Sequence, residues 1–169
     1  MWLKRRACRT RLTLALAGVL ALPPLLQAEE LKTVRHESLG FNVDLPAWNI
    51  FPGEEDISSI RVTTGAAVIV GLFHMQDKSL GELKAFIAQH APPAGAKVST
   101  KDFEHPAGPA FHWRSVEQKD EYRAVGHSYF IEAQGVIYNV NCQSKSKTDQ
   151  EEAAWDELCE DVAASFELN

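Results

Sequence analysis

Residues 135–166 read GVIYNVNCQSKSKTDQEEAAWDELCEDVAASF, and this stretch decides the predicted fold. Its first part alternates, with Val136, Tyr138, Val140 and Cys142 on one face, which is the two-residue period of a β-strand. Its second part, from about Thr148, spaces apolar residues three and four apart, as in an amphipathic helix. The members of that stripe are Trp155, Leu158, Cys159, Val162 and Phe166. We therefore expect a helix that folds back onto the strand preceding it.

The rest of the chain extends this pattern to a sheet of several strands. The segments 110–118 and 121–133 read as a hairpin turned at Lys119-Asp120, and a polar loop at 144–147 precedes the last helix. Further upstream, Ser79 followed by Glu82 has the spacing of a capping box and predicts a second helix. Runs of strands joined by short turns favour an antiparallel sheet with helices packed on it, an α+β fold.

The N-terminal residues 1–28 have the features of a secretory signal peptide. Five basic residues precede an apolar run over residues 12–22, which is too short to span a bilayer. Cleavage after Ala28 is expected to leave residues 29–169 as a single domain without a stable membrane anchor. Cys8 precedes the apolar run and leaves with the signal, so we do not interpret it as a lipidation site.

The charge of the exported part argues against nucleic acid as a partner. Removing five basic residues and no acidic one changes the formal net charge from −6 to −11. Nucleic-acid affinity comes mainly from Lys and Arg contacts to phosphates, so a chain this acidic is a poor binder. We expect a periplasmic or secreted protein with no nucleic-acid partner.

The two remaining cysteines predict a disulfide. Cys142 and Cys159 both fall on the inward faces of their elements, and an exported protein meets an oxidising compartment. A loop of this length would stabilise the fold by roughly 3 kcal/mol. Two buried thiols remain an alternative. A metal pair is a weaker alternative, because two cysteines supply only half of a tetrahedral site.

Three segments of the chain resemble the PsbP-like superfamily of small exported domains. They are Gly40 to Trp48, Gly135 to Val140, and the end of the last helix, Ala163 to Phe166. The resemblance implies an antiparallel sheet sandwiched between helices. It also implies a non-enzymatic accessory or adaptor role, and it offers no catalytic motif to carry over.

The hairpin holds the candidate binding residues. A two-residue turn at Lys119-Asp120 would place His112 opposite His127, with Arg114 and Tyr129 on the same face. Two neighbouring imidazoles suit a metal or a small ligand, although a third metal ligand is missing. The alternative is a pair of ordinary half-buried histidines. The opposite face of the hairpin carries aromatic residues that are either core or a ligand platform: Phe111, Trp113, Tyr122 and Phe130.

No catalytic signature appears in the sequence, which lacks a phosphate-binding glycine loop, a His-Glu-x-x-His and a nucleophile elbow. We therefore expect a non-enzymatic, cofactor-free accessory or binding protein that contacts another protein of the cell envelope. Three alternatives remain. One is a metal or small-molecule binder using His112 and His127. Another is an immunity-type protein that neutralises an envelope-targeted toxin. The last is an enzyme with a dispersed site.

Overall fold

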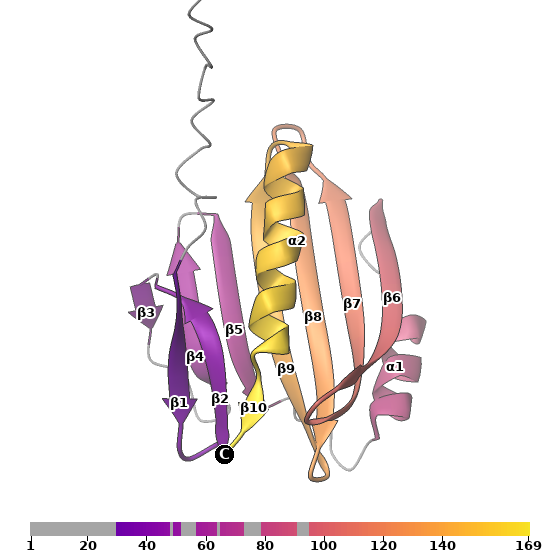
Figure 1. Cartoon of the computed structure of the whole chain (residues 1–169). Helices are drawn as coiled ribbons and strands as arrows, with labels where there is room; N and C mark the ends of the chain where they lie inside the picture. Colours follow the sequence, from indigo (N-terminus) through magenta and orange to yellow (C-terminus); the bar gives the residue numbers. More distant parts are fainter. Residues whose placement is uncertain (1–29, 48, 52–56, 64, 73–78, 91–94) are drawn as a thin grey trace, which may run out of the picture.

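The structure is a computed structural model that describes residues 30–47, 49–51, 57–63, 65–72, 79–90 and 95–169. Figure 1 shows the helices α1 and α2 packed on a broad twisted array of strands. In chain order the elements are β1 (Leu31–His36), β2 (Phe41–Pro46), β3 (Asn49–Phe51), β4 (Ile57–Thr63), β5 (Ala66–Leu72), α1 (Leu80–Gln89), β6 (Ala96–His105), β7 (Gly108–Gln118), β8 (Arg123–Ala133), β9 (Val136–Ser146), α2 (Asp149–Ala164) and β10 (Glu167–Leu168).

The strands form two antiparallel sheets. The larger has seven strands in the order β3-β4-β5-β9-β8-β7-β6, and the smaller has the order β1-β2-β10. The strands β6 to β9 follow one another as hairpins, and β9 returns to pair with β5. The α+β class expected from the sequence is therefore correct. The separation of the first strands into a second sheet was not expected.

Helices cover both faces of the large sheet (Figure 1). The helix α2 packs on β8 and β9 beside the small sheet. On the other face, Leu83 of α1 packs with Phe111, Phe130 and Ile137, which alternate with the residues that face α2. The expected sandwich of a sheet between helices is thus present. It also confirms Phe111 and Phe130 as core, with ring centroids 4.8 Å apart.

One hydrophobic cluster joins the small sheet, the large sheet and α2. Phe41 of β2, Tyr138 of β9 and Phe166 after α2 meet with ring centroids between 5.0 and 5.7 Å apart. Val162 and Cys159 of α2 are fully buried in the same cluster. Burial of these apolar side chains is the main force that holds the small sheet in place.

Both helices begin at the capping boxes predicted from the sequence. Ser79 accepts a hydrogen bond from the backbone of Glu82, and the Glu82 carboxylate accepts one from the backbone of Ser79. Thr148 and Glu151 make the same reciprocal pair at the start of α2. Each box satisfies backbone N–H groups that would otherwise have no partner in the helix.

The predicted register of the β7–β8 hairpin was wrong by two residues. Gln118 pairs with Arg123 rather than with Glu121, because the turn holds four residues rather than two. His112 therefore lies opposite Tyr129, not opposite His127, and Arg114 lies opposite His127. A shift of two residues is one full strand period, so every side chain keeps its predicted face. The predicted loop at 144–147 is also shorter than expected, since β9 continues to Ser146.

The cysteines lie together, but they are not bonded in this structure. Cys142 and Cys159 are both free thiols and both 0% exposed. Both belong to the same buried cluster, and burial, followed by the neighbouring Cys142, raises the pKa of the Cys159 thiol. The predicted facing of the two residues is therefore correct, whereas the predicted disulfide is not formed here.

The predicted signal peptide, residues 1–28, lies outside the described residues. Neither of the two described helices has the length and apolar content needed to cross a bilayer.

Candidate functional site

The four residues singled out in the hairpin lie on the face of the sheet that α2 covers. His112 and Arg114 come from β7, and His127 and Tyr129 come from β8. The antiparallel register sets His112 beside Tyr129 and Arg114 beside His127. Because strand residues two apart share a face, all four side chains point toward the same side of the sheet.

A chain of hydrogen bonds runs from α2 through the two histidines. His127 Nε2 lies 2.9 Å from Asp156 Oδ1, and His127 Nδ1 lies 3.0 Å from His112 Nε2. An ionised carboxylate accepts hydrogen bonds, so His127 Nε2 carries the proton and donates. In neutral His127 the Nδ1 atom then accepts, and His112 Nε2 donates to it. Asp156 thus sets the tautomers of both rings.

Both imidazoles are held in the neutral form. Burial, followed by the charges of His127 and Arg114, lowers the pKa of His112 to about 4. Burial also lowers the pKa of His127, which is 1% exposed, and Asp156 only partly offsets this effect. Near neutral pH the pair therefore acts as fixed hydrogen-bonding groups and carries no charge.

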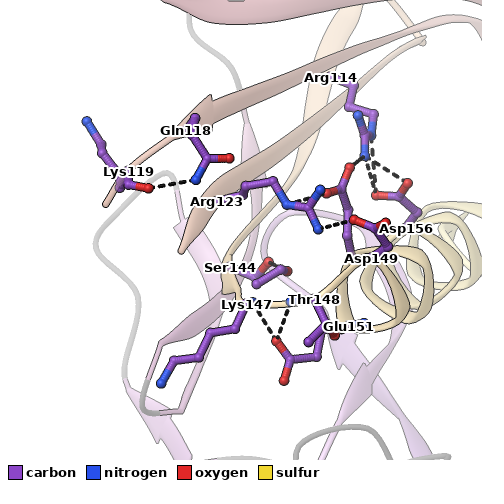
Figure 2. Close-up of polar contacts among 12 residues, drawn as sticks. Arg114, Gln118, Lys119, Arg123, Ser144, Lys147, Thr148, Asp149, Glu151 and Asp156 are labelled. Carbon is purple, nitrogen blue, oxygen red and sulfur yellow. Dashed lines mark hydrogen bonds and ion pairs between the residues drawn. The ribbon is translucent and has the colours of Figure 1, made fainter. Parts of the chain in front are cut away.

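Two arginines join the same strands to α2. Arg114 contacts both Asp156 oxygens, with Nη2 2.9 Å from Oδ2, and its Nη2 also lies 2.6 Å from Glu152 Oε1. Arg123 pairs with Asp149 at 2.6 Å and lies 3.0 Å from Glu152 Oε2, an ion pair without hydrogen-bond geometry. Figure 2 shows both guanidinium groups reaching toward the α2 carboxylates. These contacts fix the position of α2 over the hairpin.

The ring of Tyr129 is buried, whereas its hydroxyl remains accessible from the open space beside α2. Its side chain is 6% exposed, and its ring stacks on His112 with centroids 4.2 Å apart. Phe103 meets the same ring edge-on at 6.2 Å. No hydrogen bond to the Tyr129 hydroxyl occurs within the described residues. Burial raises the pKa of Tyr129, so the hydroxyl keeps its proton.

These groups line a pocket of about 460 Å³, which we call the histidine pocket. The strands β6, β7 and β8 form one wall and the C-terminal half of α2 forms the other. The strand side contributes Lys101, Phe103, Glu104, His105, Pro106, His112, Arg114, His127 and Tyr129. The helix side contributes Asp156, Glu160, Ala163 and Ala164. The volume lies within the roughly 300–1,000 Å³ typical of small-molecule sites.

His105 lies where β6 and α2 both end, which we call the lower end of the pocket, and it fixes the end of α2. The Ala107 N–H donates to His105 Nδ1 at 3.1 Å, so Nε2 carries the ring proton and donates to the Ala163 carbonyl at 3.1 Å. Burial lowers the pKa of His105. Its role is structural, because it satisfies a carbonyl in the last turn of the helix.

Sequence reasoning missed the helix side of the site. The residues that complete it there are Glu152, Asp156 and Glu160, and Lys101 and Phe103 complete it on β6. The signal was present in the four-residue spacing of the three acidic residues, which places them on one helical stripe. It was overlooked because the apolar stripe of the same helix was used to predict which side faces the sheet.

The geometry does not favour a metal site. Zinc bound to both rings would hold their nitrogens roughly 3.3 Å apart, with both lone pairs directed at the ion. Here one nitrogen donates to the other at 3.0 Å, and Asp156 already accepts from the far side of His127. In the described part of the chain, no group of three or more His, Cys, Asp or Glu is placed to hold a metal ion.

The four aromatic residues on the opposite face divide between the core and the surface. Trp113 packs at the edge of the small core beneath α1, together with Phe111 and Phe130. Tyr122 lies in the hairpin turn, where Lys145 Nζ sits 5.3 Å from its ring centroid. The core interpretation therefore holds for Phe111 and Phe130, whereas half-buried Trp113 and Tyr122 both line a hollow of about 640 Å³.

These features define an α+β protein of the Mog1/PsbP-like fold. The Ran-binding protein Mog1p of Saccharomyces cerevisiae is 13% identical with a TM-score of 0.56, over 83% of this chain and 96% of that chain. LpqN, involved in cell envelope biogenesis of Mycobacterium tuberculosis, is 12% identical with a TM-score of 0.51, over 83% of this chain and 91% of LpqN. PA94 of Pseudomonas aeruginosa, a protein of unknown function, is 18% identical with a TM-score of 0.44, over 75% and 92%.

The chain matches no protein-family model and no curated protein sequence. At these identities the first two structures show a shared fold and nothing more about function.

Proposed function

We propose that this chain is an exported, non-enzymatic accessory protein that binds another protein of the cell envelope, and that the histidine pocket is its recognition site. The observation that carries the proposal is the convergence of His112, Arg114, His127 and Tyr129 on one pocket. The pocket is preorganised by the bonds of Asp156 to Arg114 and His127, so little ordering is needed on binding.

The protonation states in the pocket support binding rather than catalysis. A general acid or base works best with a pKa near the working pH. The pKa of His112 is lowered to about 4, and burial raises the pKa of Tyr129 away from neutrality. The residues that line the pocket include no serine, threonine or cysteine that would act as a nucleophile.

Export is supported by the basic and apolar segments of residues 1–28. We further propose that Cys142 and Cys159 become a disulfide after export, because both thiols are buried in one cluster and Cys142 lies near enough to raise the pKa of Cys159. The two thiols would lose two protons and two electrons to a disulfide donor, which is reduced to two thiols. The bond would join α2 to β9 directly behind the pocket.

Membership of the PsbP-like superfamily is part of the same proposal. The matching folds of Mog1p and LpqN support it. An accessory role is consistent with the printed descriptions of those two proteins, one Ran-binding and the other involved in envelope biogenesis.

Site-specific photo-crosslinking in living cells tests the proposed recognition site. A photoreactive residue replaces Glu160 at the rim of the pocket, and the matched control places it at exposed Lys32 on β1. We expect one adduct with an envelope protein from position 160 and none from position 32. An adduct with a toxin would identify the immunity-type role. Equal adducts from both positions, or none from position 160, would contradict the proposal.

A further inference from the structure

Two unpaired charges of opposite sign face the histidine pocket from its two walls. Lys101 lies on β6 and Glu160 lies on α2, and both side chains line the pocket. Neither makes an ion pair or a side-chain hydrogen bond with any described residue. The arginines of the neighbouring strands, by contrast, are each bound to two carboxylates of α2. Glu104 of β6 also borders the pocket. It alternates with Phe103 and His105, so its carboxylate belongs to the sheet face on which Asp102 pairs with Lys84 of α1. On the face that α2 covers, the pocket therefore has one unpaired positive charge on the strand wall and one unpaired negative charge on the helix wall.

The floor between these walls offers hydrogen bonds that are also unused. The Tyr129 hydroxyl reaches the pocket, keeps its proton and has no partner in the part of the chain that the structure describes. A neutral hydroxyl can donate a hydrogen bond to a ligand atom that replaces water in the pocket. The hydroxyl is therefore placed to donate to a ligand.

The lower end of the pocket is apolar. Its lining residues are Phe103, Pro106, Ala163 and Ala164. Both ring nitrogens of the neutral His105 are hydrogen-bonded to the backbone. A ligand that fills the whole pocket would place charged atoms near Lys101 and Glu160 and apolar atoms below. Small-molecule sites commonly combine an apolar lining with a few polar groups that orient the ligand.

We propose that the histidine pocket binds a small zwitterion with an apolar side chain, of the kind of a free apolar α-amino acid. Its carboxylate pairs with Lys101 and accepts from the Tyr129 hydroxyl, and its ammonium pairs with Glu160. Its side chain packs on Phe103 and Ala163. This inference rests on the proposed recognition site, to which it adds a ligand class.

A ligand with a single charge fits the pocket less well. A simple carboxylate would meet Glu160 and Asp156, and a simple amine would meet Lys101 and Arg114. A like charge without a compensating partner costs binding free energy, which makes the pocket selective by repulsion as well as attraction.

Calorimetric titration of the purified chain tests this selectivity. The probes are L-leucine and L-phenylalanine, with isoamylamine and isocaproate as the leucine analogues that lack the carboxylate or the ammonium. We expect the amino acids to bind at least about tenfold more tightly than either analogue, as for loss of one charge-assisted hydrogen bond. Equal binding of L-leucine and its two analogues, or no binding of either amino acid, would overturn the proposal.

Charge-removing variants assign the two ends of the ligand. Lys101→Gln should lower the affinity for L-leucine and raise the affinity for isoamylamine. Glu160→Gln should lower the affinity for L-leucine and raise the affinity for isocaproate. Matched controls are Lys97→Gln and Glu157→Gln, which remove charges from the same two elements outside the pocket lining. Tyr129→Phe should weaken the binding of L-leucine and isocaproate and leave the affinity for isoamylamine unchanged. Unchanged affinity for L-leucine in both Lys101→Gln and Glu160→Gln would contradict the assignment.

The outcomes separate this inference from the proposed function. A position-160 adduct with an envelope protein, without amino-acid binding, retains the recognition site and rejects the zwitterion. Amino-acid binding with no adduct retains the zwitterion site and rejects the protein partner.

Discussion

Single residues in the histidine pocket illustrate how context changes the chemistry of a side chain. His112 and His127 would titrate near pH 6.5 in water, yet both are neutral here because burial disfavours the charged ring. Sequence reasoning identified the two histidines and their shared face. It did not identify Asp156, which sets their tautomers from a different element.

The lowered pKa of His112 makes the stability of the protein depend on pH. In the unfolded chain this histidine takes up a proton near pH 6.5, whereas in the fold it does so near pH 4. The unfolded state therefore binds more protons between these values, and the free energy of unfolding falls as pH falls through this window. His112→Gln should reduce that loss between pH 6.5 and 5 by about 1 kcal/mol, after allowing for solvent screening.

Urea unfolding at pH 7.5, 6.5 and 5 measures this effect. His36→Gln serves as the control, because His36 lies outside the pocket on β1. An equal pH-dependent loss in wild type and His112→Gln would show that His112 is not responsible.

Gly108 has a conformation and a neighbour that exclude a side chain. Its φ is +150°, and an added Cβ would lie 2.2 Å from the carbonyl oxygen of Glu132. Gly108→Ala should therefore destabilise the fold by more than about 2 kcal/mol, since strain and a backbone clash combine. Gly95→Ala is the matched control, with φ +92° and open space around the added atom. Thermal melting of both variants measures the difference, and equal melting temperatures would contradict this account.

At the scale of the element, α2 carries both the fold and the site. One stripe of the helix is apolar and buries Trp155, Cys159 and Val162. A second stripe carries Glu152 and Asp156, which hold the arginines of the hairpin. The apolar stripe was predictable from its spacing. The pairing of the acidic stripe was not, because it depends on the register of β7 and β8.

The capping box of α2 should contribute measurably to stability. Thr148→Ala removes the acceptor for the Glu151 N–H and should lower the free energy of unfolding by about 1 kcal/mol. Thr148→Ser keeps a hydroxyl acceptor and should restore most of that loss. Chemical denaturation measures both variants. If Thr148→Ser is as unstable as Thr148→Ala, packing of the methyl group rather than capping is responsible.

At the scale of the whole molecule, the last helix ties two sheets into one core. Phe166 follows α2 and packs on Phe41 of the small sheet and Tyr138 of the large one. The next two residues, Glu167 and Leu168, then pair with β2. The end of the chain thus closes the small sheet, which local sequence patterns did not reveal.

A disulfide between Cys142 and Cys159 should stabilise the exported protein. Reductant should lower the free energy of unfolding by about 3 kcal/mol, or roughly 10 °C in melting temperature for a domain of this size. The double variant Cys142→Ser/Cys159→Ser should melt at one temperature with and without reductant. Thiol counting by mass spectrometry after alkylation gives an independent readout. Two alkylated cysteines in the unreduced exported protein would show that the bond does not form.

Periodicity and turn chemistry were sufficient to predict the α+β class, both capping boxes, the facing of the two cysteines and the shared face of the four site residues. These features depend on neighbours close in sequence, whose geometry follows from the strand and helix repeats. Only the tertiary structure determined the hairpin register, the second sheet and the α2 wall of the pocket. Each depends on contacts between residues far apart in the chain, where packing and turn length outweigh local preference.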